Sequence, residues 1–202
     1  MLYRRLAAEG RQVRKVEFPN YQSPSSALIK MYLEGAFGAS PGAVDPYIAS
    51  TFYTVDRYAT YKGEWESFYL SGGIIIADRY TTANMVHQTV KITKAEAKED
   101  YLRWLMDFEY RLFGLPEPDC VIFLDMPPEY SDKLRAARSE KEGPASRDIH
   151  ESDADFMTRS YVSSVEMAAR FQWIRVTCVA NNKLRDIEEI HNEVYSIVKS
   201  LF

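Results

Sequence analysis

Short strand-like segments that alternate with longer helical patterns are the feature that most constrains how this chain can fold. Each is four to six residues long: Val13–Phe18 alternates between apolar and charged residues, Ile74–Ala77 and Val121–Leu124 are continuous apolar runs, and Ile174–Val179 is the last such segment. Runs of this length are typical of buried parallel strands, and helices between such strands serve as crossovers. The sequence therefore predicts an α/β fold with a doubly wound parallel sheet surrounded by helices.

The stretches between these runs predict helices. We expect helices through Leu2 and Leu6 up to Gly10, and over Ser25–Leu33, Asp45–Tyr69, Lys94–Leu112, Pro128–Ala137, Asp153–Arg170 and Leu184–Leu201. Residues 139–146 are expected to form a loop. The chain opens inside a helix, although a helix that feeds a parallel strand normally follows a neighbouring strand. We therefore expect the first strand of the sheet, and the loop after it, to be missing from this sequence.

Length and charge limit the classes of protein to consider. The 202 residues suit one domain, which we expect to span residues 1–202. The net charge of −4 makes nucleic acid a poor candidate partner, and the apolar runs are too short to cross a bilayer. Cys120 and Cys178 lie in apolar segments and predict buried structural thiols in a reducing cytoplasm. We expect a cytoplasmic protein with no membrane partner.

Ionisable residues follow two of the expected strands directly. Asp78-Arg79-Tyr80 comes after Ile74–Ala77, and the carboxyl ends of parallel strands are where α/β sheets bind ligands. The carboxylate could lie near a hydrated cation, while the planar guanidinium suits a phosphate. A structural ion pair at the sheet edge is the alternative. For Asp125, after the third run, we expect a helix cap or turn rather than a metal ligand.

Two other groups of residues could bind a ligand. Tyr53 and Arg57 share one helix face and could hold a flat base, although an arginine lying over an aromatic ring would look the same in sequence. Phe52, Val55 and Ala59 are expected in the core. The cations Arg135, Arg138, Lys141 and Arg147 surround Gly143 and Pro144. They could form a flap over a triphosphate or, because acidic residues are interleaved, a solvated helix end.

Several short motifs occur in a specific order along the chain. They are Phe18-Pro19-Asn20-Tyr21, the Tyr53–Arg57 pair, Ala77-Asp78-Arg79-Tyr80 followed by Asn84, Gly114-Leu115-Pro116-Glu117-Pro118-Asp119, and Arg147 after the basic segment. In this order and spacing they resemble the thymidylate kinase (dTMP kinase) family of P-loop nucleoside-monophosphate kinases. The resemblance covers essentially the whole chain from Leu2 onward.

The resemblance implies an activity and an acceptor site. The family transfers the γ-phosphoryl of ATP to dTMP, giving dTDP and ADP, and uses Mg²⁺. By matching position, Tyr53 would stack on thymine, Arg57 would donate to the carbonyl at position 4, and Asn84 would touch the same base edge. Phe18 would wall the nucleoside pocket, and Tyr21 and Arg79 would hold the monophosphate. His87 stands where the family usually has an aromatic residue under the sugar.

The resemblance also implies a donor site. Asp78 would help to position magnesium, through water, and the acceptor phosphate. Arg138 and Arg147 would belong to a lid over ATP at about residues 135–151, and Ala180 and Asn181 would lie near adenine. Together with Asp78 and Arg79, the two lid arginines are the expected catalytic residues. A homodimer is common in the family, and the Asp45–Tyr69 helix is the surface expected to form it.

The start of the chain departs from the family pattern, because the sequence contains no G-x-x-x-x-G-K-[ST]. That loop cradles the donor phosphates, so we expect this chain as given to lose most donor binding. Three hypotheses follow: a thymidylate kinase whose sequence begins too late, a non-catalytic dTMP-binding remnant, and another nucleoside or nucleotide kinase. Coding sequence upstream, dTMP affinity without turnover, and a panel of acceptors would separate them.

Overall fold

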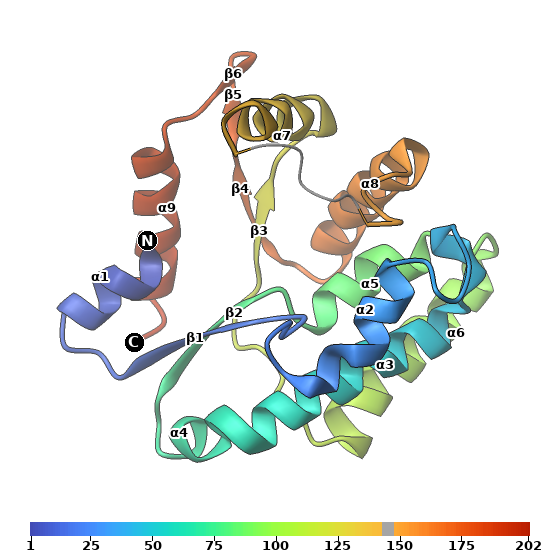
Figure 1. Ribbon diagram of the computed structural model, residues 1–202. Helices are drawn as coiled ribbons and strands as arrows, with labels where there is room; N and C mark the ends of the chain where they lie inside the picture. Colours follow the sequence, from blue (N-terminus) through green and yellow to red (C-terminus); the bar gives the residue numbers. More distant parts are fainter. Residues whose placement is uncertain (143–147) are drawn as a thin grey trace.

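The computed structural model describes residues 1–142 and 148–202, without the side chains of residues 138–142. It confirms the predicted α/β class (Figure 1). Its parallel strands are β1 (Val13–Glu17), β2 (Ile74–Asp78), β3 (Ile122–Asp125) and β4 (Ile174–Thr177). Among the described residues, β1 pairs with β2 and β3 pairs with β4, so the strands form two separate pairs.

Helices surround the strands. The α-helices are α1 (Leu2–Ala8), α2 (Ala27–Leu33), α3 (Pro46–Thr60), α4 (Glu66–Leu70), α5 (Thr81–Thr89), α6 (Ala95–Met106), α7 (Pro128–Glu142), α8 (Ala154–Arg170) and α9 (Ile187–Lys199). Short 3₁₀ turns are η1 (Pro24–Ser26) and η2 (Pro41–Ala43), and π-helical segments are η3 (Tyr61–Trp65) and η4 (Asp107–Leu112). None of the described helices is both long and apolar enough to span a membrane.

The helices lie on two sides of the strands. Helices α1 and α9 contact each other, and they contact β1 and β4 respectively, at the side of the molecule that holds both termini (Figure 1). On the other side, α3, α5 and α6 contact one another. Val16 of β1 is buried there with Phe18, Trp65, Tyr80 and Leu115. This two-sided arrangement is what a doubly wound architecture requires.

The strands are less buried than their apolar sequences predict. The three isoleucines of β2 are only partly buried, and Leu124 of β3 is 51% exposed. The expectation of fully buried strands is therefore wrong for these residues. A pair of strands has no neighbour on its outer edges, so part of its apolar surface stays in contact with solvent.

Four local expectations need correction. The sequence pattern did not predict helix α5, because its threonines favour turns and strands over helices. Helix α7 continues to Glu142, since the residues at 139–142 are polar helix formers with no glycine or proline among them. The last apolar run ends in a hairpin of β5 (Val179–Ala180) and β6 (Lys183–Leu184), where Asn181 and Asn182 adopt positive φ. Cys178 is buried as expected, whereas Cys120 is only partly buried.

Helix α3 buries its polar side and exposes apolar residues. Its buried positions are Ala49, Ser50, Thr54, Asp56, Arg57 and Thr60. Val55 is 41% exposed and Ala59 is exposed, so the expectation that they pack in the core is wrong. The inversion arises because the polar residues of this helix contact buried partners, which are described below.

Candidate functional site

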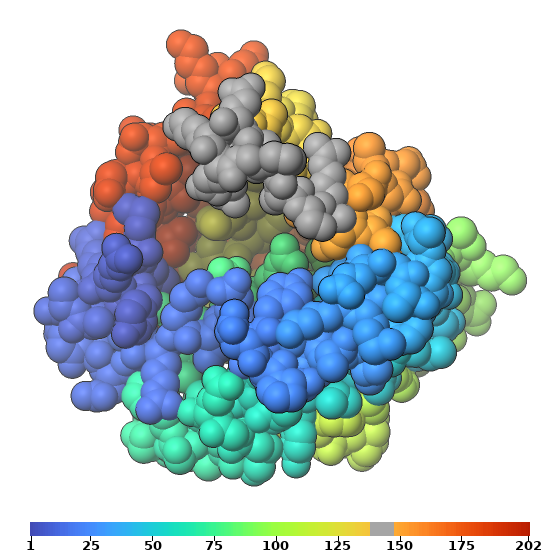
Figure 2. Space-filling model, in the orientation of Figure 1, coloured from blue at the N-terminus to red at the C-terminus, as the bar shows by residue number. Residues whose placement is uncertain are grey.

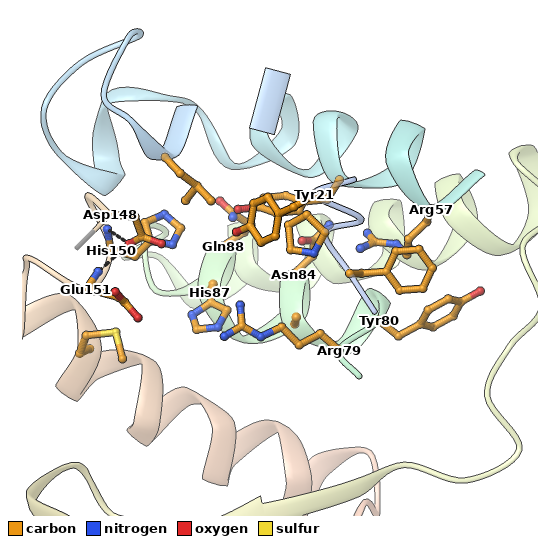
Figure 3. Close-up of a pocket in the computed structure, with 16 residues that line it drawn as sticks. Tyr21, Arg57, Arg79, Tyr80, Asn84, His87, Gln88, Asp148, His150 and Glu151 are labelled. Atoms are coloured by element: carbon orange, nitrogen blue, oxygen red, sulfur yellow. Dashed lines mark hydrogen bonds between the residues drawn. The ribbon is translucent and has the colours of Figure 1, made fainter. Parts of the chain in front are cut away.

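A pocket lies between α3, α5, the segment after β1 and the residues that follow position 147 (Figure 3). Its lining comprises Phe18, Pro19, Tyr21, Leu33, Tyr53, Arg57, Arg79, Tyr80, Ala83, Asn84, His87, Gln88, Asp148, His150, Glu151 and Met157. Figure 2 shows a hollow in one face of the molecule, above the blue N-terminal segments and beside the orange segment near residue 160. The structure thus brings together in one pocket the seven residues that the resemblance assigns to the acceptor substrate.

Asp56 holds the loop after β1 against α3. Its carboxylate accepts hydrogen bonds from the backbone N–H of Asn20, at 2.8 Å, and from the hydroxyl of Ser25, at 2.6 Å. Phe18 and Tyr21 belong to this loop, and Phe18 packs against Tyr80 with ring centroids 5.8 Å apart. Because Asp56 is fully buried, the loop has a fixed position at the mouth of the pocket.

Arg57 is fixed by a buried carboxylate. Its Nε donates to Oε2 of Glu109 at 2.8 Å, and its Nη2 donates to Oε1 of the same residue. Both side chains are almost completely buried. A guanidinium has five N–H donors, and Nη1 takes no part in this ion pair. The ion pair therefore orients the arginine while leaving donors for a ligand.

Gln88 is a pocket residue that the sequence interpretation missed. It is 1% exposed, and its Oε1 has no hydrogen-bond partner among the described residues. Burying an unpaired amide oxygen is costly, so this atom needs a donor from whatever occupies the pocket. Gln88 lies one turn after Asn84 on α5, and only the recognition of that helix could have placed the two residues side by side.

Arg79 brings a positive charge to the pocket from the end of β2. Its φ of +64° is left-handed, a conformation that is uncommon outside glycine and costs energy. Figure 3 shows its guanidinium extended toward His87. Its charge opposes the rise in pKa that burial causes at Tyr21 and Tyr53, and it adds to burial in lowering the pKa of His87.

Two histidines stack beside one another at the inner end of the pocket. The rings of His87 and His150 lie 6.1 Å apart, and Nδ1 of His87 is 3.3 Å from the Ser160 hydroxyl. Nε2 of His150 is 2.9 Å from the hydroxyl of Tyr32, which also accepts from Lys91 at 2.9 Å. Burial, with the nearby positive charges of Arg79 and Lys91, lowers the pKa of His87 to about 3 and that of His150 to about 4.

The lowered pKa values predict that the fold weakens in mild acid. An unfolded histidine has a pKa of about 6.5, so below that pH the unfolded chain binds protons that the folded chain excludes. The free energy of unfolding should not depend on these histidines above about pH 6.5. Between pH 6.5 and pH 4 it should decrease by at most about 1.4 kcal/mol per pH unit for each histidine. Urea unfolding at several pH values measures this slope.

The matched control is the third histidine of the chain. His150→Gln should flatten the slope, whereas His191→Gln on α9 should leave it unchanged. A slope that is the same in wild type and His150→Gln would contradict the buried-histidine explanation.

Asp78 does not line the pocket. Its side chain is 56% exposed and lies 3.3 Å from Nζ of Lys15, which also contacts Glu17 at 3.3 Å. Within the described part of the chain, no group of three or more histidine, cysteine or acidic residues is arranged to hold a metal ion. Magnesium is commonly held by one or two carboxylates together with substrate phosphates and water. An exposed carboxylate at a strand end fits that mode.

Asp125 has a different role from the one expected. Instead of capping a helix, its carboxylate accepts from Nε of Arg175 at 2.8 Å and from the hydroxyl of Tyr161 at 2.9 Å. Arg175 lies on β4, beside β3, so the two strands hold the ion pair in place. Asp125 thus links β3 to β4 and α8, and the expectation of a cap or turn is wrong.

The residues expected at the donor site either lie outside the pocket or are among those that the structure does not describe. The side chain of Arg138, and Arg147 altogether, belong to the residues that the structure does not describe. Ala180 and Asn181 lie on the exposed β5–β6 hairpin, at the far end of the molecule from α3 (Figure 1). The described lining of the pocket therefore includes none of the residues expected to lie over ATP or beside adenine.

Several known proteins are similar to this chain in sequence. Thymidylate kinases of two Mycobacterium tuberculosis strains are each 26% identical over 167 residues, which is 81% of this chain and 75% of the relative. A probable thymidylate kinase of Thermococcus onnurineus is 29% identical over 129 residues, covering 64% of this chain and 53% of the relative. The thymidylate kinase of Plasmodium falciparum is 22% identical over 94% of this chain and 77% of its own length. Residues 1–194 match the sequence profile of thymidylate kinases, and the chain belongs to the thymidylate kinase family.

Proposed function

We propose that the pocket binds dTMP as the phosphoryl acceptor of a thymidylate kinase. Membership of the family establishes the reaction class, in which ATP donates a phosphoryl group to dTMP. The observation that carries the proposal is the buried edge made by Arg57, Asn84 and Gln88 in one wall of the pocket. These groups offer N–H donors and carbonyl acceptors side by side, as a thymine edge with a carbonyl and an N–H requires.

The remaining pocket residues have roles that follow from their chemistry. The rings of Phe18 and Tyr53 provide flat apolar surface for a base. Arg79, at the carboxyl end of β2, would bind the 5′-phosphate through two parallel hydrogen bonds, with the hydroxyl of Tyr21 as a further donor. The stacked His87 and His150 would lie against the sugar. Positioning of this kind, with charge stabilisation, is the main contribution that proteins make to phosphoryl transfer.

The donor side of the proposal rests on family resemblance. Asp78, which is exposed at the end of β2, would help to hold a magnesium ion through water. Residues 135–151 would form the lid, with Arg138 and Arg147 over ATP. The described end of this segment is anchored, because the backbone N–H of Ile149 donates to the Leu33 carbonyl at 3.1 Å. The magnesium, when bound, neutralises developing phosphate charge.

A panel of nucleotides tests the acceptor site without any need for turnover. In titration calorimetry we expect dTMP to bind and dCMP to bind about 10- to 100-fold more weakly, because an amino group at position 4 leaves the Arg57 donors unpaired. Thymidine and UMP test the phosphate and the sugar. Preference for dCMP, or for thymidine over dTMP, would contradict the proposal. A coupled ATP assay on the same protein then tests catalysis separately.

The same proposal includes a homodimer and a cytoplasmic location. Ile48, Val55 and Tyr58 form an exposed apolar stripe along α3, at positions that share one helix face. A second copy of the helix would cover this stripe. A chain that sediments as a monomer at micromolar concentration would contradict the dimer. Free Cys120 and Cys178 suit a reducing compartment, and fractionation of cells would test the location.

A further inference from the structure

We infer that Glu109 is the positioning residue that sets the pyrimidine specificity of the pocket, an inference that rests on the proposed binding of dTMP. Glu109 lies outside the pocket lining, and no motif of the family resemblance includes it. Its carboxylate nevertheless holds two of the residues that would read the base, Arg57 and Asn84.

Glu109 is the centre of a buried network that joins three helical segments. Besides the two bonds from Arg57, its oxygens accept from the hydroxyl of Thr81 at 2.6 Å and from Nδ2 of Asn84 at 3.5 Å. The hydroxyl of Thr54 lies 3.1 Å from Oε1 and 2.9 Å from the Ser50 carbonyl, and its one proton can go to either acceptor. Thr54 and Arg57 are three residues apart on α3, and Thr81 and Asn84 are three apart on α5. Each of these side chains is at most 3% exposed.

A carboxylate placed this way can act only through its neighbours. It has about four lone-pair positions, and donors from α3 and α5 already occupy them. Glu109 lies in the π-helical segment η4, whose widened turn is a recurrent feature of functional sites. Its backbone carbonyl also accepts from the N–H of Leu115 at 3.0 Å, so both ends of the residue are fixed.

The acceptor-only character of the carboxylate decides which way Asn84 points. An asparagine amide can present either its nitrogen or its oxygen, but an ionised carboxylate can only accept. Asn84 must therefore turn Nδ2 toward Glu109, and its Oδ1 remains for the base. Arg57, held through Nε and Nη2, contributes donors beside that oxygen. Glu109 thus orients Arg57 and Asn84 so that a donor and an acceptor both face the pocket.

This order of donor and acceptor matches one class of pyrimidine. Thymine and uracil present an acceptor at position 4 and an N–H at position 3, so both contacts are satisfied. Cytosine presents the reverse, an amino group at position 4 and a bare nitrogen at position 3, and both contacts fail. The unpartnered Oε1 of Gln88 adds a second acceptor on the same helix face.

Calorimetric titration of dTMP and dCMP into Glu109→Gln tests the inference. Glutamine can donate as well as accept, so the amide of Asn84 loses its fixed orientation, and the ratio of dTMP to dCMP affinity should fall at least about tenfold. Glu109→Asp keeps an acceptor-only group and should retain the ratio while both affinities drop. Asp107→Asn, which changes an exposed carboxylate in the same segment, should alter neither affinity.

The outcomes separate this inference from the proposed function. A folded Glu109→Gln protein in which both affinities fall in parallel would make Glu109 purely structural, and a folded Glu109→Asp protein that loses the ratio would contradict the acceptor-only explanation. If circular dichroism shows that Glu109→Gln does not fold, N3-methyl-dTMP with the wild-type protein decides, since equal affinity with dTMP would overturn the orientation assigned to Asn84. Wild-type protein that binds neither nucleotide would instead overturn the acceptor site itself.

Discussion

Replacing Arg57 by methionine should lower the free energy of unfolding by about 3–5 kcal/mol, because it leaves the Glu109 carboxylate buried without its charge partner. Glu109 is 0% exposed, so water cannot replace the two lost hydrogen bonds. The threonine hydroxyls that remain are neutral donors and compensate only in part. Urea unfolding followed by circular dichroism measures the loss, and dTMP binding should disappear with it.

A double variant and an exposed arginine provide the controls. Removing both charges in Arg57→Met with Glu109→Met should recover part of the lost stability, because no buried charge is left unpaired. The recovery is incomplete because the hydroxyl of Thr81 and Nδ2 of Asn84 then lose their buried acceptor. Arg111→Met, which breaks an exposed pair with Asp107 in the same η4 segment, should cost less than about 1 kcal/mol. Losses that simply add in the double variant would show that the two side chains do not depend on each other.

Replacing Arg79 by alanine should weaken dTMP binding by about 100-fold and leave thymidine binding unchanged. A guanidinium that donates two charge-assisted hydrogen bonds to a phosphate contributes a few kcal/mol, and thymidine has no phosphate to lose. The fold should change little, because Arg79 is exposed and alanine has the same Cβ atom, and so about the same backbone cost, at this left-handed position. Calorimetry with the two ligands compares these effects directly.

Two further substitutions at this position separate charge from backbone. Arg79→Gly relieves the positive φ and should bind dTMP as poorly as the alanine variant. Arg79→Lys keeps the charge without the planar fork and should fall between wild type and alanine. Thymidine affinity that drops in parallel with dTMP affinity would mean that Arg79 shapes the pocket rather than binding the phosphate.

The strand pattern and the family motifs predicted the fold class and seven of the residues that line the pocket, but not the residues that support them. Glu109 lies in Asp107-Phe108-Glu109-Tyr110, where acidic residues alternate with aromatic ones and neither helical nor strand periodicity marks a buried carboxylate. Glu109 is buried because η4 packs against α3 and α5, which are distant in sequence, and only the three-dimensional structure shows this contact. Gln88 was missed because the helix that carries it is rich in β-branched residues, which weaken the helical signal.

Helix α3 also shows where prediction from the sequence pattern fails. Apolar periodicity predicted a core position for Val55, whereas the helix turns Thr54, Asp56 and Arg57 inward. Periodicity assumes that the buried face is the apolar one. That assumption fails where a helix forms the wall of a polar site, and such failures are themselves indications of function.

Helix packing and the pocket connect the two strand pairs of the molecule. No backbone ladder joins β2 and β3 among the described residues, whereas helix α5 packs on α8 between the two pairs. The pocket takes residues from both of these helices, including His87 and Met157. A nucleotide that contacts both helices would therefore strengthen the packing between them, and the protein should resist thermal unfolding more strongly as the nucleotide concentration rises.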